Sequence, residues 1–204
     1  MHRTLSAFVV MLGLAALAAQ TTRAADSESS SGRDSSSADV VFVPTPNDVV
    51  LKMLELGKVG KDDVLYDLGC GDCRIPVLAA KKFGCRGVGY DIDPQRVKES
   101  KENIKKNGVE KLVQVERENI FKLDLSPASV VTLYLLPTLN VKLIPQLEKL
   151  KPGSRIVAHD FDMAGVKPDK VITMTSKETN REHTIYLWTV PLKKVSKAVK
   201  SVDE

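Results

Sequence analysis

Strand-like and helix-like segments alternate along the middle of this chain, and this alternation constrains the fold more than any other feature. Short apolar runs typical of buried strands are followed by longer segments in which apolar residues recur at helical spacing. The expected strands are 64–68, 87–90, 112–115, 130–135 and 155–158, and the expected helices are 74–83, 94–107 and 139–150. This order is typical of α/β proteins, in which crossover helices connect the strands of a parallel sheet.

The last part of the chain departs from this pattern. Two β-rich runs, KVITMTS (170–176) and HTIYLWTV (183–190), are separated only by the polar residues 177–182. A link this short leaves no room for a crossover helix, so the two strands must pair antiparallel. We therefore predict a Rossmann-like, doubly wound and mostly parallel sheet of seven strands with a C-terminal antiparallel hairpin.

A further helix precedes the first strand. In the segment FVPTPNDVVLKMLELGKV, which begins at Phe42, apolar residues recur at helical spacing. Thr45 followed by Pro46 is a typical helix start, so we expect Thr45 to cap this helix and Pro46 to be its first residue. By the same reasoning, Asp93 is expected to cap the helix that begins at Pro94.

The two ends of the chain differ in composition from its middle. Residues 1–25 combine a short basic start, an apolar stretch and small residues, which predicts a secretory signal peptide or an N-terminal anchor. The serine-rich residues 26–39 predict a disordered linker before a domain at 40–192, and 193–204 predict a basic flexible tail. We expect a protein that is exported, to the periplasm or out of the cell, or anchored in the membrane by its N-terminal segment.

The charge of the chain gives little support for a nucleic-acid partner. The 30 basic and 26 acidic residues leave a formal net charge of +4, spread over the sequence. Nucleic-acid binding usually requires a stronger or more concentrated basic surface. We expect no nucleic-acid partner, and we expect the protein to be a monomer.

The turn after the first expected strand carries the clearest functional signal. It reads DLGCGDCR, and its glycines, Gly69 and Gly71, allow the backbone to turn tightly and approach a ligand. Asp91 ends the second strand, about 20 residues later, where a carboxylate can accept both hydroxyls of a ribose. Together these residues predict an adenosine-like ligand.

The residues around the two glycines indicate whether the ligand is a dinucleotide or a cationic nucleoside. The dinucleotide pattern G-x-G-x-x-G requires a third glycine where this chain has Arg74. Asp67, two positions before the first glycine, would be unfavourable beside a pyrophosphate but suits a positively charged amino-acid group. The turn therefore points to S-adenosylmethionine, which carries an ammonium and a sulfonium.

These motifs resemble those of class I S-adenosylmethionine-dependent methyltransferases. DLGCGDCR is similar to their first motif, GVGYDIDP to their ribose motif, and ERENIFKLDL to their adenine-contacting loop. The segments FVPTP, VVTLYLLP, RIVAHDF and HTIYLW further resemble a group of small protein-lysine methyltransferases. That group includes archaeal broad-specificity enzymes and the mitochondrial family that methylates a lysine of the ATP-synthase c subunit.

The resemblance implies a cofactor site, an acceptor pocket and a protein substrate that is methylated on lysine. The implied cofactor-binding residues are Asp67, Gly69, Cys70, Gly71, Asp91, Ile92 and Asn119, and the implied pocket walls are Leu135, Leu136 and Pro137. No residue is predicted as a catalytic base, because methyl transfer depends mainly on orienting the nucleophile. A small-molecule methyltransferase and an exported, catalytically inactive ligand-binding homologue are the alternatives.

Two positions depart from the family pattern. Cys73 replaces the third glycine, which would add a side chain near the ligand if the backbone there has a positive φ. Asn119 occupies the place of the acidic residue in the adenine loop, with Glu118 one position early.

Other reactive residues give weaker signals. Cys70 and Cys73 form a C-x-x-C pair that leaves a redox role open, although Cys85 is the only other cysteine and no metal site is predicted. His159 and Asp160 follow the fifth strand near the expected substrate entrance, where a structural and a catalytic role are equally open.

Overall fold

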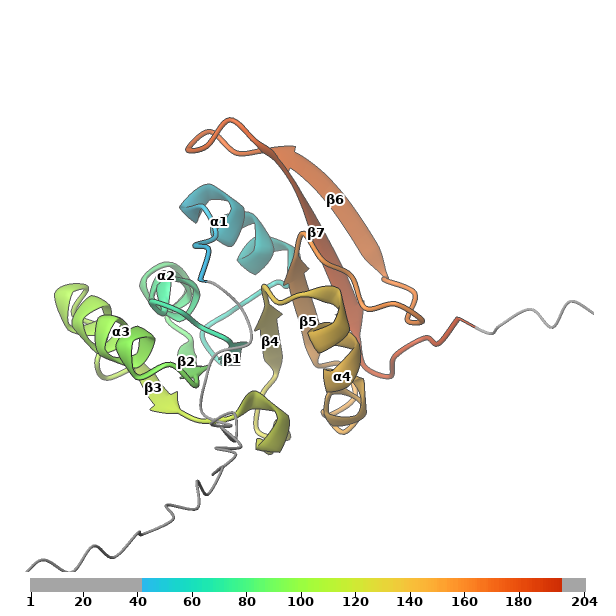
Figure 1. Cartoon of the computed structure of the whole chain (residues 1–204), viewed down its shortest axis with the longest axis horizontal. Coiled ribbons are helices and arrows are strands. Elements are labelled where there is room, and N and C mark those ends of the chain that lie inside the picture. The colour runs from blue at the N-terminus through green and yellow to red at the C-terminus, as the bar shows by residue number, and fades with distance from the viewer. Residues whose placement is uncertain (1–41, 196–204) are drawn as a thin grey trace, which may run out of the picture. The chain divides into compact units, whose positions relative to one another are not determined.

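The computed structural model describes residues 42–195 and contains one seven-stranded sheet, in the order β3-β2-β1-β4-β5-β7-β6 (Figure 1). Strands β1 to β5 pair in parallel with one another, whereas β7 runs antiparallel to both β5 and β6. The predicted fold, including the C-terminal hairpin, is confirmed. The strands are β1 Val64–Leu68, β2 Arg86–Asp91, β3 Val113–Arg117, β4 Val130–Leu133, β5 Arg155–His159, β6 Lys170–Thr175 and β7 Glu182–Thr189.

The helices cover both faces of the sheet. They are α1 Asn47–Leu56, α2 Arg74–Phe83, α3 Pro94–Lys106 and α4 Pro137–Leu147, with a short 3-10 helix η1 at Ile120–Lys122. Helix α4 begins two residues before the predicted start because Pro137 takes the first helical position, where its missing N–H is not needed. Strand β4 ends correspondingly earlier, at Leu133.

Alternate residues of each strand divide the core into two layers. Tyr66, Leu133 and Trp188 pack with α4 on one face of the sheet. Leu65 and Val130 pack with α1 and α2 on the opposite face. Helices α1, α2 and α3 therefore lie on one side and α4 on the other (Figure 1).

The arrangement of the parallel strands places the functional segments at one edge. Strand β1 lies between β2 and β4, so the direction of winding reverses beside it. In such sheets, ligands bind outside the carboxyl ends of the strands at this reversal. The residues that follow β1, β2, β4 and β5 therefore lie along the same edge.

The start of α1 differs from the prediction. The helix begins at Asn47, so Pro46 precedes it and Thr45 does not cap it. The hydroxyl of Thr45 instead lies 3.1 Å from Nδ1 of His159, in the protein interior. A tertiary contact has replaced the local cap. Asp93 does cap α3 as predicted, because its carboxylate accepts a hydrogen bond from the backbone N–H of Gln95.

The predicted ends of the chain fall largely outside the described residues. The leader 1–25 and the linker 26–39 lie there, so both stay predictions, as does the localisation inferred from them. The predicted tail at 193–204 overlaps the fold in its first three residues: Lys193 pairs with Asp169 at 2.7 Å, and the backbone N–H of Val195 donates to Gly165. Residues 193–195 are therefore not a free tail.

Within residues 42–195, none of the helices combines the length and apolar character needed to cross a membrane.

Candidate functional site

The turn between β1 and α2 is fixed in shape by its backbone. Gly69, Gly71 and Cys73 all adopt left-handed conformations, with φ of +77°, +57° and +60°. The N–H groups of Gly69 and Cys70 both donate to the carbonyl of Tyr90, at 2.8 and 3.0 Å. These bonds hold the turn against the end of β2, so it is preorganised for a ligand.

The two glycines of this turn cannot be replaced without a clash. A Cβ at Gly69 would lie 2.8 Å from Cδ2 of Leu135, and one at Gly71 would lie 2.0 Å from the ring of Phe42. Leu135 and Phe42 therefore pack directly against bare backbone. A turn with two glycine positions, and with acidic residues at both sides, fits the methyl donor predicted from the sequence.

Asp67 is a buried carboxylate beside this turn. It lies opposite Thr132 in the β1–β4 pairing, and the hydroxyl of Thr132 donates to its Oδ1 at 2.7 Å. Burial raises the pKa of Asp67 to about 7, and the negative charges of Asp72 and Asp91 add to this effect. A cationic ligand would relieve this unfavourable burial of charge.

Asp91 holds the second side of the site. Its Oδ2 accepts the N–H of Gly71 at 2.9 Å, and its Oδ1 accepts the N–H of Asp93 at 3.0 Å. Burial raises the pKa of Asp91 above its usual value. Since each carboxylate oxygen can accept more than one hydrogen bond, both can still accept a ribose hydroxyl. Ile92 follows directly and is half-buried.

Asn119 lies on the loop that runs beside Asp91. The N–H of Glu118 donates to the backbone carbonyl of Asp91 at 3.1 Å, which brings this loop to the ribose side of the site. The side-chain oxygen of Asn119 caps η1 by accepting the N–H of Phe121 at 3.0 Å. Its amide nitrogen is then the group suited to an adenine ring, and this role stays a prediction.

The backbone of Cys73 does have a positive φ, but its side chain points into the core. Cys73 is fully buried and packs with Cys70 and Ile104. A hydrogen bond with Cys73 and burial raise the pKa of the Cys70 thiol well above its usual value. All three cysteines are free and buried, which disfavours the thiolate chemistry of a redox site.

The two thiols also leave no room for a side chain at Gly89 of β2. A Cβ at Gly89 would lie 2.2 Å from Sγ of Cys73 and 2.8 Å from Sγ of Cys70. We expect Gly89→Ala to lower the free energy of unfolding by about 2 to 3 kcal/mol, because buried sulfur atoms cannot move aside freely. Urea denaturation measures this loss.

A second change tests the cause of that loss. Adding Cys73→Gly to the Gly89→Ala chain should restore part of the stability, because it removes the closer sulfur atom and a strained left-handed residue. A Gly89→Ala chain as stable as the wild type would show that the predicted clash is not real.

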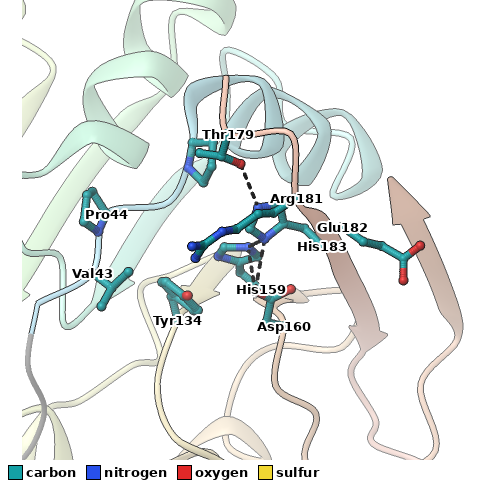
Figure 2. A pocket seen from close by; sticks show the side chains of 10 residues that line it. Val43, Pro44, Tyr134, His159, Asp160, Thr179, Arg181, Glu182 and His183 are labelled. Atoms are coloured by element: carbon teal, nitrogen blue, oxygen red, sulfur yellow. Dashed lines mark hydrogen bonds and ion pairs between the residues drawn. The ribbon is translucent and has the colours of Figure 1, made fainter. Parts of the chain in front are cut away.

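A pocket of about 490 Å³ opens beside the ends of β5 and β7 (Figure 2). Leu135, Leu136 and Pro137 are not among its lining residues. Leu135 packs against Gly69, and the other two are exposed. Their role as acceptor walls stays a prediction. The lining residues are Val43, Pro44, Pro46, Tyr134, His159, Asp160, Thr179, Arg181, Glu182 and His183.

Two histidines and an aspartate meet in this pocket (Figure 2). Nε2 of His159 lies 2.9 Å from Nδ1 of His183, and Oδ2 of Asp160 lies 3.3 and 3.1 Å from these two nitrogens. Burial lowers the pKa of His159 to about 4, although the charge of Asp160 opposes this shift. At neutral pH the ring of His159 is therefore uncharged.

The glycine turn and the pocket share two walls. On one side, Phe42 packs on Gly71 while the next residues, Val43 and Pro44, line the pocket. On the other side, Leu135 packs on Gly69 while Tyr134 lines the pocket. A cofactor on the turn would therefore lie next to the contents of the pocket.

Comparison with known proteins decides the family. Residues 67–170 match the family described as the ANTKMT methyltransferase domain. A protein-lysine N-methyltransferase of Saccharolobus islandicus (strain REY15A) is 46% identical over 153 residues, which are 74% of this chain and 94% of that protein. The chain belongs to the ANTKMT methyltransferase family. As an ANTKMT-family protein it is a class I methyltransferase that depends on S-adenosylmethionine, so these two predictions are confirmed.

Two further relatives extend the ANTKMT comparison. The Homo sapiens lysine N-methyltransferase named for the ATP synthase c subunit is 29% identical over 131 residues, 64% of this chain and 55% of that protein. The chain therefore spans about half the length of this human relative. A crystal structure from Salinibacter ruber, described as an RNA methyltransferase in complex with S-adenosyl-L-homocysteine, is 47% identical with a TM-score of 0.67, and the match covers 79% of this chain and all of that one.

Proposed function

We propose that this ANTKMT-family enzyme transfers a methyl group from S-adenosylmethionine to the side-chain amine of a lysine in a protein substrate. The observation that carries this proposal is the 46% identity to an archaeal protein-lysine N-methyltransferase, over 94% of that protein. The human relative is likewise described as a lysine N-methyltransferase.

The pocket suits a lysine chemically. Tyr134 offers an aromatic ring and Glu182 offers a carboxylate, and both groups attract an ammonium ion. The long apolar stem of a lysine can lie along Val43 and Pro44. The pocket therefore provides an apolar wall together with groups that attract a cation.

The residues of this chain would orient the two reactants. When bound, S-adenosylmethionine supplies an electrophilic methyl group on a positively charged sulfur. Asp67 and Asp91 would contact the cofactor from the two strands that flank the glycine turn, and the turn permits close approach. The lysine, whose ordinary pKa is about 10.4, must lose a proton before it attacks. A cationic cofactor beside the pocket lowers the pKa of the lysine and favours that neutral form, whereas a carboxylate such as Glu182 favours the ammonium that first enters.

An RNA acceptor is the second candidate because the Salinibacter ruber relative is described as an RNA methyltransferase. The lining of the pocket argues against it. Arg181 is the one Lys or Arg side chain among the lining residues. RNA binding depends on several basic groups that neutralise phosphates, so this lining favours an ammonium over a nucleotide.

Methyl transfer with isotopically labelled S-adenosylmethionine distinguishes the two acceptors. We expect the purified full-length chain to label protein in a cell extract, and hydrolysis of the product should yield methylated lysine. An extract whose lysines have first been blocked by reductive alkylation should accept no label, because the nucleophile is gone. Label that appears in purified RNA and not in protein would refute the lysine proposal in favour of the RNA alternative.

A further inference from the structure

Three metal-ligating groups from two adjacent strand ends converge on one point of the pocket. We infer that His159, Asp160 and His183 form a binding site for one divalent transition-metal ion of the zinc type. Neither residue spacing nor the sequence motifs predicted this site, because His183 lies on β7 and is 24 positions from His159. The antiparallel pairing of β5 with β7 brings the two histidines together.

The distances among the three ligand atoms match those around a single metal ion. Nε2 of His159, Nδ1 of His183 and Oδ2 of Asp160 form a triangle with sides of 2.9, 3.1 and 3.3 Å. Bonds of about 2.1 Å place neighbouring ligands about 3.0 Å apart in octahedral geometry and about 3.4 Å apart in tetrahedral geometry. One ion can therefore bind all three atoms.

While the carboxyl group of Asp160 is ionised, hydrogen atoms alone do not satisfy this triangle. If one nitrogen carries a proton, the other nitrogen presents its lone pair to the carboxylate of Asp160 at 3.1 or 3.3 Å, which is repulsive. If both nitrogens carry protons, two N–H groups oppose each other across 2.9 Å. A divalent cation in the centre is attracted by all three atoms and removes this conflict.

The outer atoms of the three residues are oriented as metal ligands usually are. Nδ1 of His159 lies 3.1 Å from the hydroxyl of Thr45. Nε2 of His183 lies 3.5 Å from the hydroxyl of Thr179 (Figure 2). Partners on the second ring nitrogen fix the tautomer and direct the first nitrogen at the metal. Since both imidazoles have such a partner, both rings are held with a nitrogen facing the centre.

Asp160 is held in an uncommon conformation that directs it to the same point. Its φ is +57°, which is unfavourable for a residue with a side chain. The N–H of Thr184 donates to Oδ1 at 2.9 Å, and the N–H of Asp160 donates to the carbonyl of Thr184 at 2.7 Å. Oδ1 is thus occupied by backbone, whereas Oδ2 faces the two histidines.

The ligand set indicates which class of ion would bind. Two imidazole nitrogens and one carboxylate oxygen suit Zn²⁺ and similar transition metals, whereas Mg²⁺ and Ca²⁺ prefer sites made of oxygen atoms. Because the three residues line an open pocket, a coordination position remains accessible to water or to an oxygen or nitrogen atom of a bound molecule.

Metal binding can be measured directly on the full-length chain without a polyhistidine tag. The protein is stripped with a chelator and titrated with Zn²⁺ against a chromogenic competitor, and we expect one ion per chain. Asp160→Asn retains a side-chain oxygen for the N–H of Thr184 but removes the negative charge. We expect it to weaken Zn²⁺ binding at least about 100-fold.

Two further chains make the test specific. His183→Gln should also lose the ion, whereas His2→Gln should bind like the wild type, because His2 is the chain's only other histidine and is not part of the triangle. Circular dichroism shows whether each variant is folded. Wild-type affinity in either folded pocket variant, or no ion bound by the wild type, would overturn the inference.

Cobalt distinguishes this site from binding to cysteine. Co²⁺ in place of Zn²⁺ should give ligand-field absorption without the intense charge-transfer band of a thiolate, because no cysteine belongs to the triangle. A thiolate band would place the ion elsewhere and overturn the inference. These measurements use no methyl donor or acceptor, so their outcome is independent of the proposed lysine activity.

Discussion

Replacing Asp91 by alanine should lower the affinity for S-adenosylmethionine at least about 100-fold. The carboxylate is the predicted acceptor of both ribose hydroxyls, and each hydrogen bond to a charged group contributes about 1.5 to 3 kcal/mol. Two such bonds correspond to about 3 kcal/mol or more, and each 1.4 kcal/mol is a factor of ten. The change also frees the N–H groups of Gly71 and Asp93, which loosens the turn itself.

Isothermal titration calorimetry measures this loss of affinity, and two further variants serve as controls. Asp91→Asn retains one acceptor oxygen and should bind with intermediate affinity. Asp62→Ala removes an exposed carboxylate elsewhere on the chain and should bind normally. Undiminished affinity in a folded Asp91→Ala chain would exclude Asp91 as the ribose ligand.

Acidification should also release the cofactor, because the predicted pairing of Asp67 with it requires the ionised carboxylate. The pKa of Asp67 in the free chain is raised to about 7. A cationic ligand beside the carboxylate lowers that pKa, so the complex binds fewer protons than the free chain. Affinity should fall as the pH is lowered below about 7, approaching tenfold for each further pH unit while Asp67 stays ionised in the complex. Calorimetry between pH 8 and pH 5.5 measures this dependence.

For the stability of the free chain, Asp67 should cause the opposite pH dependence. Its pKa is about 7 in the folded state, against an ordinary value of 3.8, so the folded state binds the proton more tightly than the unfolded state. The stabilisation is complete below about pH 4 and is lost as the pH rises to about 7. Asp67→Asn should remove both pH dependences while retaining the acceptor for Thr132. If the Asp67→Asn chain keeps the pH-dependent affinity, another group is responsible.

The parts of the fold that the sequence predicts well are those specified by neighbouring residues. Helix α2 matches its expected bounds, and the short polar link before β7 correctly predicted the antiparallel hairpin. Local signals failed where a distant residue competed for the same group. Thr45 is a good helix cap by sequence, but its hydroxyl contacts His159 instead, 114 positions away.

The contrast between local signals and distant contacts also explains which residues of the site could be predicted. The glycine turn, Asp67 and Asp91 could be predicted because each lies in or directly after a strand that the sequence itself indicates. Tyr134 and His183 were missed because their role depends on which strands become neighbours in the sheet. His159 was noticed, but its partner on β7 could not be assigned. The scarcity of histidine, three in the whole chain, was the one available signal.

The segment 42–46 has a thermodynamic consequence, because it contacts the glycine turn through Phe42 and the pocket through its next residues. It is also bound at Thr45, whose carbonyl accepts a hydrogen bond from Arg74 at 3.0 Å. A molecule that shifts this segment from one side changes the fit on the other. Binding at the two sites is then thermodynamically linked. Linkage is reciprocal, so the factor by which the first ligand changes the affinity for the second equals the factor by which the second changes the affinity for the first.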